Sequence, residues 1–515
     1  MRGLSAWVFG LVVALGAQGA EAKYSLDWLE ITSPHFIVRS NADRDRATAL
    51  ITDLERFRVV MEQITSVDFT DDPTPPLLIY AFETTKQYHR DIRAFGSLGF
   101  YENRHEGAQA FLTLEPLDKR ELRPDGREVL IHEYTHHLLH QVSPLKYPRW
   151  YDEGLAEYLS TIEFRGNLAI IGGGVADRAM LLEHARWIPF QEIISAHGQY
   201  LEGGRNGLSN VSMQYSQGWL LTHFLHGQPE LWPKMNAFLM QANLRTDRAE
   251  QIFKEVFGRS PKQVGKEVKA YWKGRQLRLL QTELPDSSRM SDIQVRVMPE
   301  AEARLQVAEA RFLAGSKKTT AREFRRAFSQ ALADGIRAAD MCRYLAEIAM
   351  IREEYDEARA YAGRLAELLP DTPRAPYLTA MIGRLEAVDG DRDEALTGDA
   401  VTEFRRGLRR AIRRQKTFVP ALYNLADTYA WEGEEVSDEA FLVIDAARTL
   451  RPDSADIEVT YSKLLAKSGR FDEAEQTLRN LIAWSTHRRQ ERDLTKELRA
   501  IVEMRKAAES GASPQ

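Results

Sequence analysis

The sequence is poor in cysteine and has no long apolar run after its first residues. Cys342 is the only cysteine among 515 residues, which excludes an intramolecular disulfide. No stretch after residue 22 reads as a membrane span, so we expect no transmembrane segment in the mature chain. The net charge of -6 at pH 7 excludes the basic composition typical of nucleic-acid-binding proteins. We therefore expect no nucleic-acid partner, and the function has to come from local groups of residues.

The first residues have the pattern of an export signal. Arg2 supplies a positive charge, Ala6–Ala17 is an uncharged and mostly apolar run, and Ala20–Ala22 fits a small-residue cleavage pattern. This pattern predicts a signal peptide over residues 1–22, and the alternative is an uncleaved membrane anchor. An exported chain with so little cysteine favours a bacterial periplasm over a disulfide-rich extracellular setting.

Patterning separates an α/β region from the helical regions that follow it. Residues 23 to about 124 mix strands with helices, and helices dominate from about 125 to 275. An amphipathic helix is expected from Asp43 to Ile64. Apolar runs predict three strands, at His35–Ser40, Pro75–Phe82 and Gly107–Pro116. Residues 276–299 are weakly periodic and are interpreted as a linker.

Residues 300–510 are expected to be all-helical and to contain repeats. In the unit that begins at Pro420, apolar residues follow the pattern of a helical hairpin, Gly433 marks the turn, and Pro452 ends the second helix. Comparable units contain Leu345 and Tyr461. The spacing of about 34 residues per hairpin resembles the tetratricopeptide repeat. Such an array presents a concave surface that recruits a protein partner, and a generic helical domain is the alternative.

The run His132-Glu133-Tyr-Thr-His136 is the strongest indication of chemistry. On a helix, His132 and His136 lie one turn apart on one face, so both imidazoles can bind the same metal ion. Glu133 lies beside that face, where its carboxylate can take a proton from a water on the metal. Asp125 and Glu128 have the spacing of a capping box, which predicts where this helix begins.

A second helix supplies the third ligand in this interpretation. Pro148 can begin that helix, and Glu153 follows 17 positions after His136. Glu153 completes a His, His, Glu set for zinc, with the fourth position left to water. Glu157 comes one turn later and can accept a hydrogen bond from the far nitrogen of a ligand histidine. His140 is an alternative third ligand, and another divalent metal could replace zinc.

The two motifs together carry a family resemblance. H-E-x-x-H followed by W-x-x-E-G-L-A-E-Y at Trp150–Tyr158 resembles the gluzincin metallopeptidases, in particular the bacterial peptidase MA-like group, whose members often carry helical repeats. The resemblance implies a zincin fold over residues 23–275, with an upper α/β lobe, a zinc helix and a lower helical lobe. It implies Glu133 as general base and one zinc ion per chain, with three ligands, His132, His136 and Glu153. The expected fold class is an α+β zincin-like metallopeptidase domain followed by an all-α tetratricopeptide-repeat solenoid.

The same resemblance implies two further features of the site. An edge strand just before the zinc helix should pair with an extended substrate, and Gly107–Glu115 is the expected strand. A side chain from the lower lobe should stabilise the transition-state oxyanion. Tyr215 is the first candidate and His223 the second, with packing in the core as the alternative role for both.

The leading hypothesis is an exported zinc-dependent endopeptidase that hydrolyses protein or peptide substrates and recruits a partner or substrate through its repeats. The alternative is a catalytically idle zincin domain whose repeats form a scaffold for envelope protein assembly. A third candidate is a zinc hydrolase of a cell-wall amide. A basic helix at Glu403–Lys416 is interpreted either as a binding face for an acidic segment or anionic lipid, or as a solvated outer face.

Overall fold

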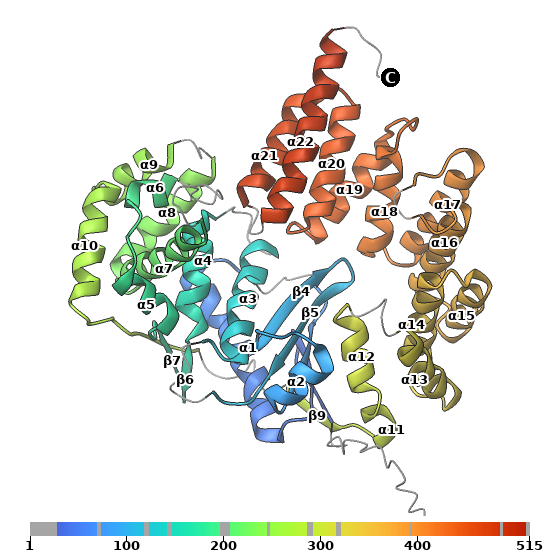
Figure 1. The fold of residues 1–515 in the computed structure, drawn as a ribbon, viewed down its shortest axis with the longest axis horizontal. Helices are drawn as coiled ribbons and strands as arrows, with labels where there is room; N and C mark the ends of the chain where they lie inside the picture. The colour runs from blue at the N-terminus through green and yellow to red at the C-terminus, as the bar shows by residue number, and fades with distance from the viewer. Residues whose placement is uncertain are drawn as a thin grey trace, which may run out of the picture.

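The computed structural model describes residues 28–69, 74–117, 123–141, 147–195, 207–244, 248–285, 292–315, 321–391, 394–484 and 488–510. Within them the chain is mostly helical, with an N-terminal α/β region and a C-terminal helical solenoid (Figure 1). The predicted signal peptide lies outside the described residues. None of the described helices combines the length and the apolar character that crossing a membrane requires.

A six-stranded sheet forms the centre of the N-terminal region, in the order β4-β5-β3-β2-β1-β9. Its strands are β1 (Leu29–Thr32), β2 (Phe36–Ser40), β3 (Leu77–Phe82), β4 (Gly99–Arg104), β5 (Gly107–Thr113) and β9 (Gln294–Val297). The central strands β2, β3 and β5 are parallel, whereas β1, β4 and β9 pair antiparallel with their neighbours. Strands β4 and β9 are therefore the two edges of this sheet.

Both faces of the sheet are covered, because alternate side chains of the strands enter two different cores. One core holds Val38 and Ile79 together with apolar residues of helix α1 (Arg44–Thr65). The other holds Tyr80 and Phe111 together with helix α2 (Thr85–Ile92) and the first helices of the solenoid. Helix α1 begins where the Asp43 side chain accepts a hydrogen bond from the backbone N–H of Arg46, as expected of an N-cap.

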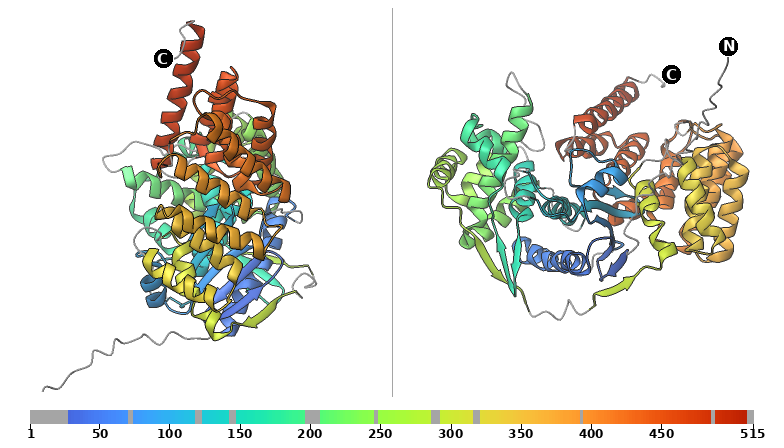
Figure 2. Two further views of the ribbon diagram at one scale, coloured as in Figure 1. Left: turned by 90° about the vertical axis from the view of Figure 1, so that its right-hand side faces the viewer. Right: turned by 60° about the horizontal axis from the view of Figure 1, so that its bottom comes forward.

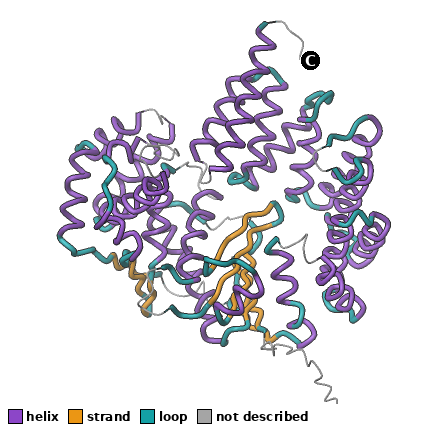
Figure 3. The backbone as a smooth tube through the Cα atoms, viewed as in Figure 1, coloured by secondary structure: helices purple, strands orange, loops and turns teal. Residues whose placement is uncertain are grey.

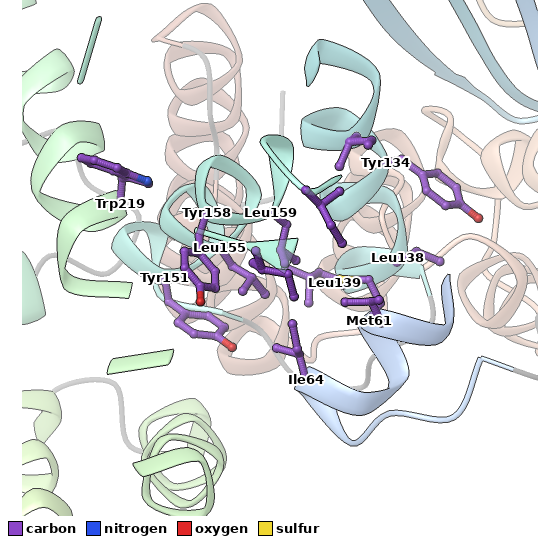
Figure 4. Close-up of a cluster of buried hydrophobic side chains, with 14 of the residues drawn as sticks. Met61, Ile64, Tyr134, Leu138, Leu139, Tyr151, Leu155, Tyr158, Leu159 and Trp219 are labelled. Atoms are coloured by element: carbon purple, nitrogen blue, oxygen red, sulfur yellow. The ribbon is translucent and has the colours of Figure 1, made fainter. Parts of the chain in front are cut away.

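Helices and a small sheet follow the α/β region. The elements are α3 (Gly126–Gln141), α4 (Arg149–Ser160), β6 (Glu163–Arg165), β7 (Leu168–Ile171), α5 (Ala176–His184), α6 (Phe190–Ser195), α7 (Gly207–His226), α8 (Trp232–Leu244), α9 (Ala249–Phe257), α10 (Pro261–Lys273) and β8 (Leu280–Glu283). Figure 4 shows apolar side chains of α1, α3, α4 and α7 meeting in one core, among them Leu138, Leu155 and Trp219. This core fixes α3 and α4 against each other.

The rest of the chain is a succession of helical hairpins. The helices are α11 (Glu300–Ala303), α12 (Gln306–Leu313), α13 (Ala321–Ala333), α14 (Ala338–Ile351), α15 (Tyr355–Leu368), α16 (Arg374–Ala387), α17 (Gly398–Arg414), α18 (Val419–Ala430), α19 (Asp438–Leu450), α20 (Ala455–Lys467), α21 (Phe471–Trp484) and α22 (Arg488–Glu509). The prediction of a helical repeat array is confirmed. Figures 2 and 3 show that this array and helices α5 to α10 lie on opposite sides of the central sheet.

Three local features differ from what the sequence indicates. Strand β5 coincides with the predicted strand at Gly107–Pro116, but it is an interior strand, so the expected edge strand at Gly107–Glu115 is wrong. The edge is β4, whose mixed side chains gave no clear apolar alternation. The segment 276–299, interpreted as a linker, contributes β8 to the small sheet and β9 to the large one. Both strands are short and exposed, which is why apolar periodicity did not reveal them.

Candidate metal centre

Helix α3 begins with reciprocal caps and packs tightly against the sheet. The backbone N–H of Asp125 donates to Glu128 Oε2 at 3.0 Å, and the backbone N–H of Glu128 donates to Asp125 Oδ1 at 2.8 Å, which confirms the predicted capping box. A Cβ at Gly126 would lie 2.1 Å from the backbone oxygen of Thr113. Glycine at this position therefore lets the first residue of α3 lie against the backbone at the end of β5.

Helix α4 is held against α7 by two glycines. A Cβ at Gly154 would lie 2.4 Å from Thr222 Oγ1 and 2.5 Å from the backbone oxygen of Gly218. A Cβ at Gly218 would lie 2.6 Å from the backbone oxygen of Trp150. The two helix backbones thus approach more closely than any side chain at these positions would permit. This contact brings Glu153, next to Gly154, within reach of side chains from α7.

The three predicted ligands converge. Nε2 of His132 and Nε2 of His136 lie 3.3 Å apart, and Glu153 Oε2 lies 3.6 and 3.4 Å from them respectively. Ligand atoms of a tetrahedral zinc site are about 3.4 Å apart when the bonds to the metal are about 2.1 Å long. The donor set and its separations therefore fit zinc.

Asp152 contacts His136 from outside the ligand cluster and orients its ring. Asp152 Oδ1 lies 3.0 Å from His136 Nδ1, and Asp152 Oδ2 lies 3.0 Å from His140 Nε2. Asp152 is 5% exposed, so one buried carboxylate joins both imidazoles and leaves His136 Nε2 directed to the ligand cluster. Asp152 was not among the predicted site residues, although it stands directly before Glu153 in the motif.

Glu157 does not make the hydrogen bond expected of it. Its Oε1 lies 4.0 Å from His132 Nδ1, beyond hydrogen-bond distance, and is bound instead by Arg178, whose Nη2 is 2.5 Å away. The reason is that Arg178, from α5, is closer to this carboxylate than the imidazole is. His140 pairs with Asp152, so it also belongs to a second group of possible metal ligands, with His136 and Asp152.

Tyr215 lies at the site and His223 does not. The Tyr215 hydroxyl donates to Glu153 Oε1 at 2.7 Å and accepts from Arg149 Nη2 at 2.9 Å. His223 is fully buried and pairs with the backbone oxygen of Gly172 at 2.9 Å, outside the ligand cluster. Burial lowers the pKa of His223, as expected for a neutral core histidine.

The charged groups of the site stabilise one another. Burial lowers the pKa of His136, but the negative charges of Asp152 and Glu153 raise it well above its usual value. Burial raises the pKa of the Glu153 carboxyl, but the charge on His136 and hydrogen bonds from His132 and His136 hold it well below its usual range. A cation placed between these groups would replace the histidine protons as the partner of Glu153.

Glu133 directly follows the predicted ligand His132 on α3 and is half-buried. Among the described residues, its carboxylate forms no hydrogen bond or ion pair, although its charge acts on the Tyr101 hydroxyl. A cavity of about 280 Å³ opens next to the cluster, lined by His132, Val129 and Arg178 among others. The arrangement thus combines a possible metal site, a carboxylate base and space for a ligand.

The chain is similar to known proteins over part of its length. No family model matches the chain. The uncharacterized protein YhcO of Bacillus subtilis (strain 168) is 32% identical over 102 residues, which cover 17% of this chain and 30% of YhcO. The chain thus spans less than a third of that relative's length. Yeast Tom70 is similar in structure with a TM-score of 0.32 and 12% sequence identity, over 64% of this chain and 70% of Tom70.

The comparison with family models overturns the assignment to the gluzincin metallopeptidases and their MA-like group, because no peptidase model matches the chain. The assignment depended on two short motifs on α3 and α4. Their spacing follows from the pitch of a helix and leaves the sheet and the other helices unconstrained. The architecture that is shown is coarser: an N-terminal α/β region followed by a mostly helical solenoid.

Proposed function

We propose that the chain is a metal-dependent hydrolase of peptide bonds whose helical array binds protein. The convergence of three donor atoms from His132, His136 and Glu153 within 4.8 Å of one another carries this proposal. Zinc is the metal that best suits two imidazoles and one carboxylate. We also propose that the chain is exported to a periplasm, on the basis of residues 1–22.

Bound zinc would supply a Lewis acid for a scissile carbonyl and would lower the pKa of water. The carboxylate of Glu133 takes the proton of the attacking water and returns it to the leaving amine. Asp152 holds the Nδ1 proton of His136, which keeps Nε2 free for the metal. Tyr215 is bonded to Glu153, so in this proposal it positions the ligand carboxylate rather than stabilising an oxyanion.

The test is zinc content together with cleavage of unfolded casein, measured with and without a chelator. Glu133→Gln should abolish cleavage and leave zinc near one per chain. Glu163→Gln, on the exposed strand β6, is the matched control and should leave both unchanged. Casein cleavage that survives in Glu133→Gln, or that ignores the chelator, would contradict the proposal.

A second candidate is a protein-binding scaffold in which the metal is structural. It is favoured by the length of the helical array and by the lack of any matching peptidase model. In this case zinc should raise the midpoint of thermal unfolding by binding only the folded chain, whereas wild-type protein and Glu133→Gln should both fail to cleave casein. Cleavage of casein by the wild-type protein but not by Glu133→Gln would therefore support the hydrolase, and no cleavage by either protein would support the scaffold.

A further inference from the structure

The tip of the β4–β5 hairpin lies inside the curve of the helical array. Figure 1 shows helices α12 to α20 arranged in an arc around this tip. Four consecutive residues at the tip, Asn103 to Glu106, contact helix ends and side chains from successive parts of the array. The inner face of the array is thus in contact with the chain's own α/β region.

Hydrogen bonds and ion pairs make these contacts specific. Arg451, at the end of α19, donates from Nη1 to the backbone oxygen of Arg104 and from Nη2 to Asn103 Oδ1. Arg451 is 6% exposed, so these bonds are shielded from water. The ring of His105 lies 4.7 Å from that of Tyr423 on α18, and His105 Nε2 lies 3.2 Å from Ser454 Oγ.

The hairpin also forms ion pairs with the array. Glu106 forms ion pairs with Arg374 of α16 at 2.6 Å and with Arg343 of α14 at 3.4 Å. Arg104 donates to the backbone oxygen of Leu313 at the end of α12. Contacts of one turn with α12, α14, α16, α18 and the α19–α20 turn fix the hairpin at several points at once.

The strands of the hairpin run back beside helix α3, which carries two of the predicted metal ligands. β4 is an edge of the large sheet, and its Tyr101 hydroxyl lies 2.6 Å from His137 Nδ1 on α3. The charges of Glu133 on α3 and of Asp453 and Arg451 in the array all act on the Tyr101 hydroxyl. Gln141, the last residue of α3, donates to the backbone oxygen of Leu450 at 2.7 Å. The helical array therefore contacts the C-terminal end of α3 as well as the hairpin.

We propose that the β4–β5 hairpin is an internal ligand of the helical array, and that its docking restricts access of an extended polypeptide to the edge of β4. A free edge strand binds an extended peptide by backbone pairing, and that edge runs beside the helix that carries His132 and Glu133. Release of the tip from the array opens the edge. The inference rests on the proposed function, because it treats the edge of β4 as the place where an extended substrate is held.

Two variants test the docking from opposite sides. Arg451→Ala removes the bonds to Asn103 and Arg104 from the array, and Glu106→Gln removes the ion pairs from the hairpin. Arg448→Ala is the matched control, because Arg448 lies three residues before Arg451 but pairs with Glu458 and Asp445 within the array. All are made in the full, zinc-loaded chain carrying Glu133→Gln, so that binding is measured without cleavage.

The readouts are hydrogen exchange of residues 99–113 and binding of fluorescently labelled unfolded casein. Both test variants should speed hydrogen exchange in the hairpin and tighten casein binding about tenfold, the factor that corresponds to loss of one charged hydrogen bond, and Arg448→Ala should change neither. The inference would be overturned if hydrogen exchange were unchanged in both test variants, or if no variant bound casein. It would also be overturned if exchange became faster while casein binding stayed the same or weakened. Failure of the proposed function gives a different result. In that case the chain with Glu133 intact would not cleave casein, even if the test variants bind casein more tightly as expected.

Discussion

The Tyr215 hydroxyl donates a 2.7 Å hydrogen bond to Oε1 of Glu153, while Oε2 of the same carboxylate faces His132 and His136. One oxygen of Glu153 is thus held by the protein and the other is directed to the candidate metal position. Arg149, 4% exposed, bonds the same hydroxyl and lies 3.8 Å from Glu153. The orientation of this ligand therefore depends on α7 as well as on α4.

Tyr215→Phe should weaken zinc binding by roughly tenfold or more, because partners that orient a ligand contribute about that much to metal affinity. The rate of casein cleavage at saturating zinc should fall much less, since the proposed role is positioning. Zinc affinity by competition with a chelating dye, and kcat at saturating zinc, separate the two effects. Tyr361→Phe, which removes a similar tyrosine–glutamate bond to Glu357 in the array, is the control. Unchanged affinity with a large loss of kcat would instead assign the hydroxyl to the reaction itself.

Asp152→Asn should lower zinc affinity more than Glu157→Gln does. Asp152 touches His136 and His140 at 3.0 Å, whereas Glu157 is 4.0 Å from His132 and already paired with Arg178. We expect a loss of about 10- to 100-fold for Asp152→Asn, and a smaller one for Glu157→Gln. The measurement is the same dye competition at pH 7.5. An equal loss in both variants would show that distance to the imidazole is not what decides the effect.

The sequence predicts the parts of the site that depend on helical geometry alone. The spacing of His132 and His136 is one helical turn, and the capping box at Asp125 sets where that helix begins, so both could be read from the residues. The prediction of Glu153 near them relied on a motif and on one connecting segment. The structure brings these side chains together, and their roles stay predictions.

Tertiary contacts decided what the sequence did not predict. Glu157 has the right spacing for His132, but Arg178, 21 positions later, binds it instead. β4 is the edge strand because β5, its partner in the hairpin, also pairs with β3 on its other side. No local sequence pattern shows which of the two strands of a hairpin will pair with a third strand. The contacts between residues 103–106 and the array join parts of the chain that are hundreds of positions apart, as in the 347 positions between Arg104 and Arg451.

Gly154→Ala should destabilise the region around α4 even though alanine is the better helix former. The added Cβ would lie 2.4 Å from Thr222 Oγ1 and 2.5 Å from the backbone oxygen of Gly218, so α4 and α7 would have to separate. Overpacking of this kind costs about 1–3 kcal/mol, and it would displace the adjacent Glu153. Thermal unfolding with and without zinc measures both effects. Gly363→Ala is the control, since a Cβ there meets no atom within 4 Å.

Glu309→Gln should reduce both the stability of the junction between the sheet and the array and its dependence on pH. Glu309 is buried and pairs with Arg39 of β2 at 3.0 Å and with Arg337 at 2.6 Å. Removing one partner of a buried ion pair costs about 3–5 kcal/mol, because the other charges stay buried.

The direction of the pH effect follows from the shift of the Glu309 carboxyl. Burial raises its pKa, but Arg39 and Arg337 lower it from 4.5 to about 2. A carboxyl with a lowered folded-state pKa contributes stability that is complete above pH 4.5 and is lost as the pH falls toward about 2. The protection factors of α12 and α14 amides, which correct hydrogen exchange for its intrinsic dependence on pH, should therefore fall between pH 4.5 and 2.5 in the wild-type chain, and be lower but less pH-dependent in Glu309→Gln. Glu323→Gln, which removes an exposed ion pair with Arg311, is the control and should follow the wild-type pH profile. If the profile of Glu309→Gln were as steep as that of the wild-type chain, carboxyls other than Glu309 would set the acid sensitivity of this junction.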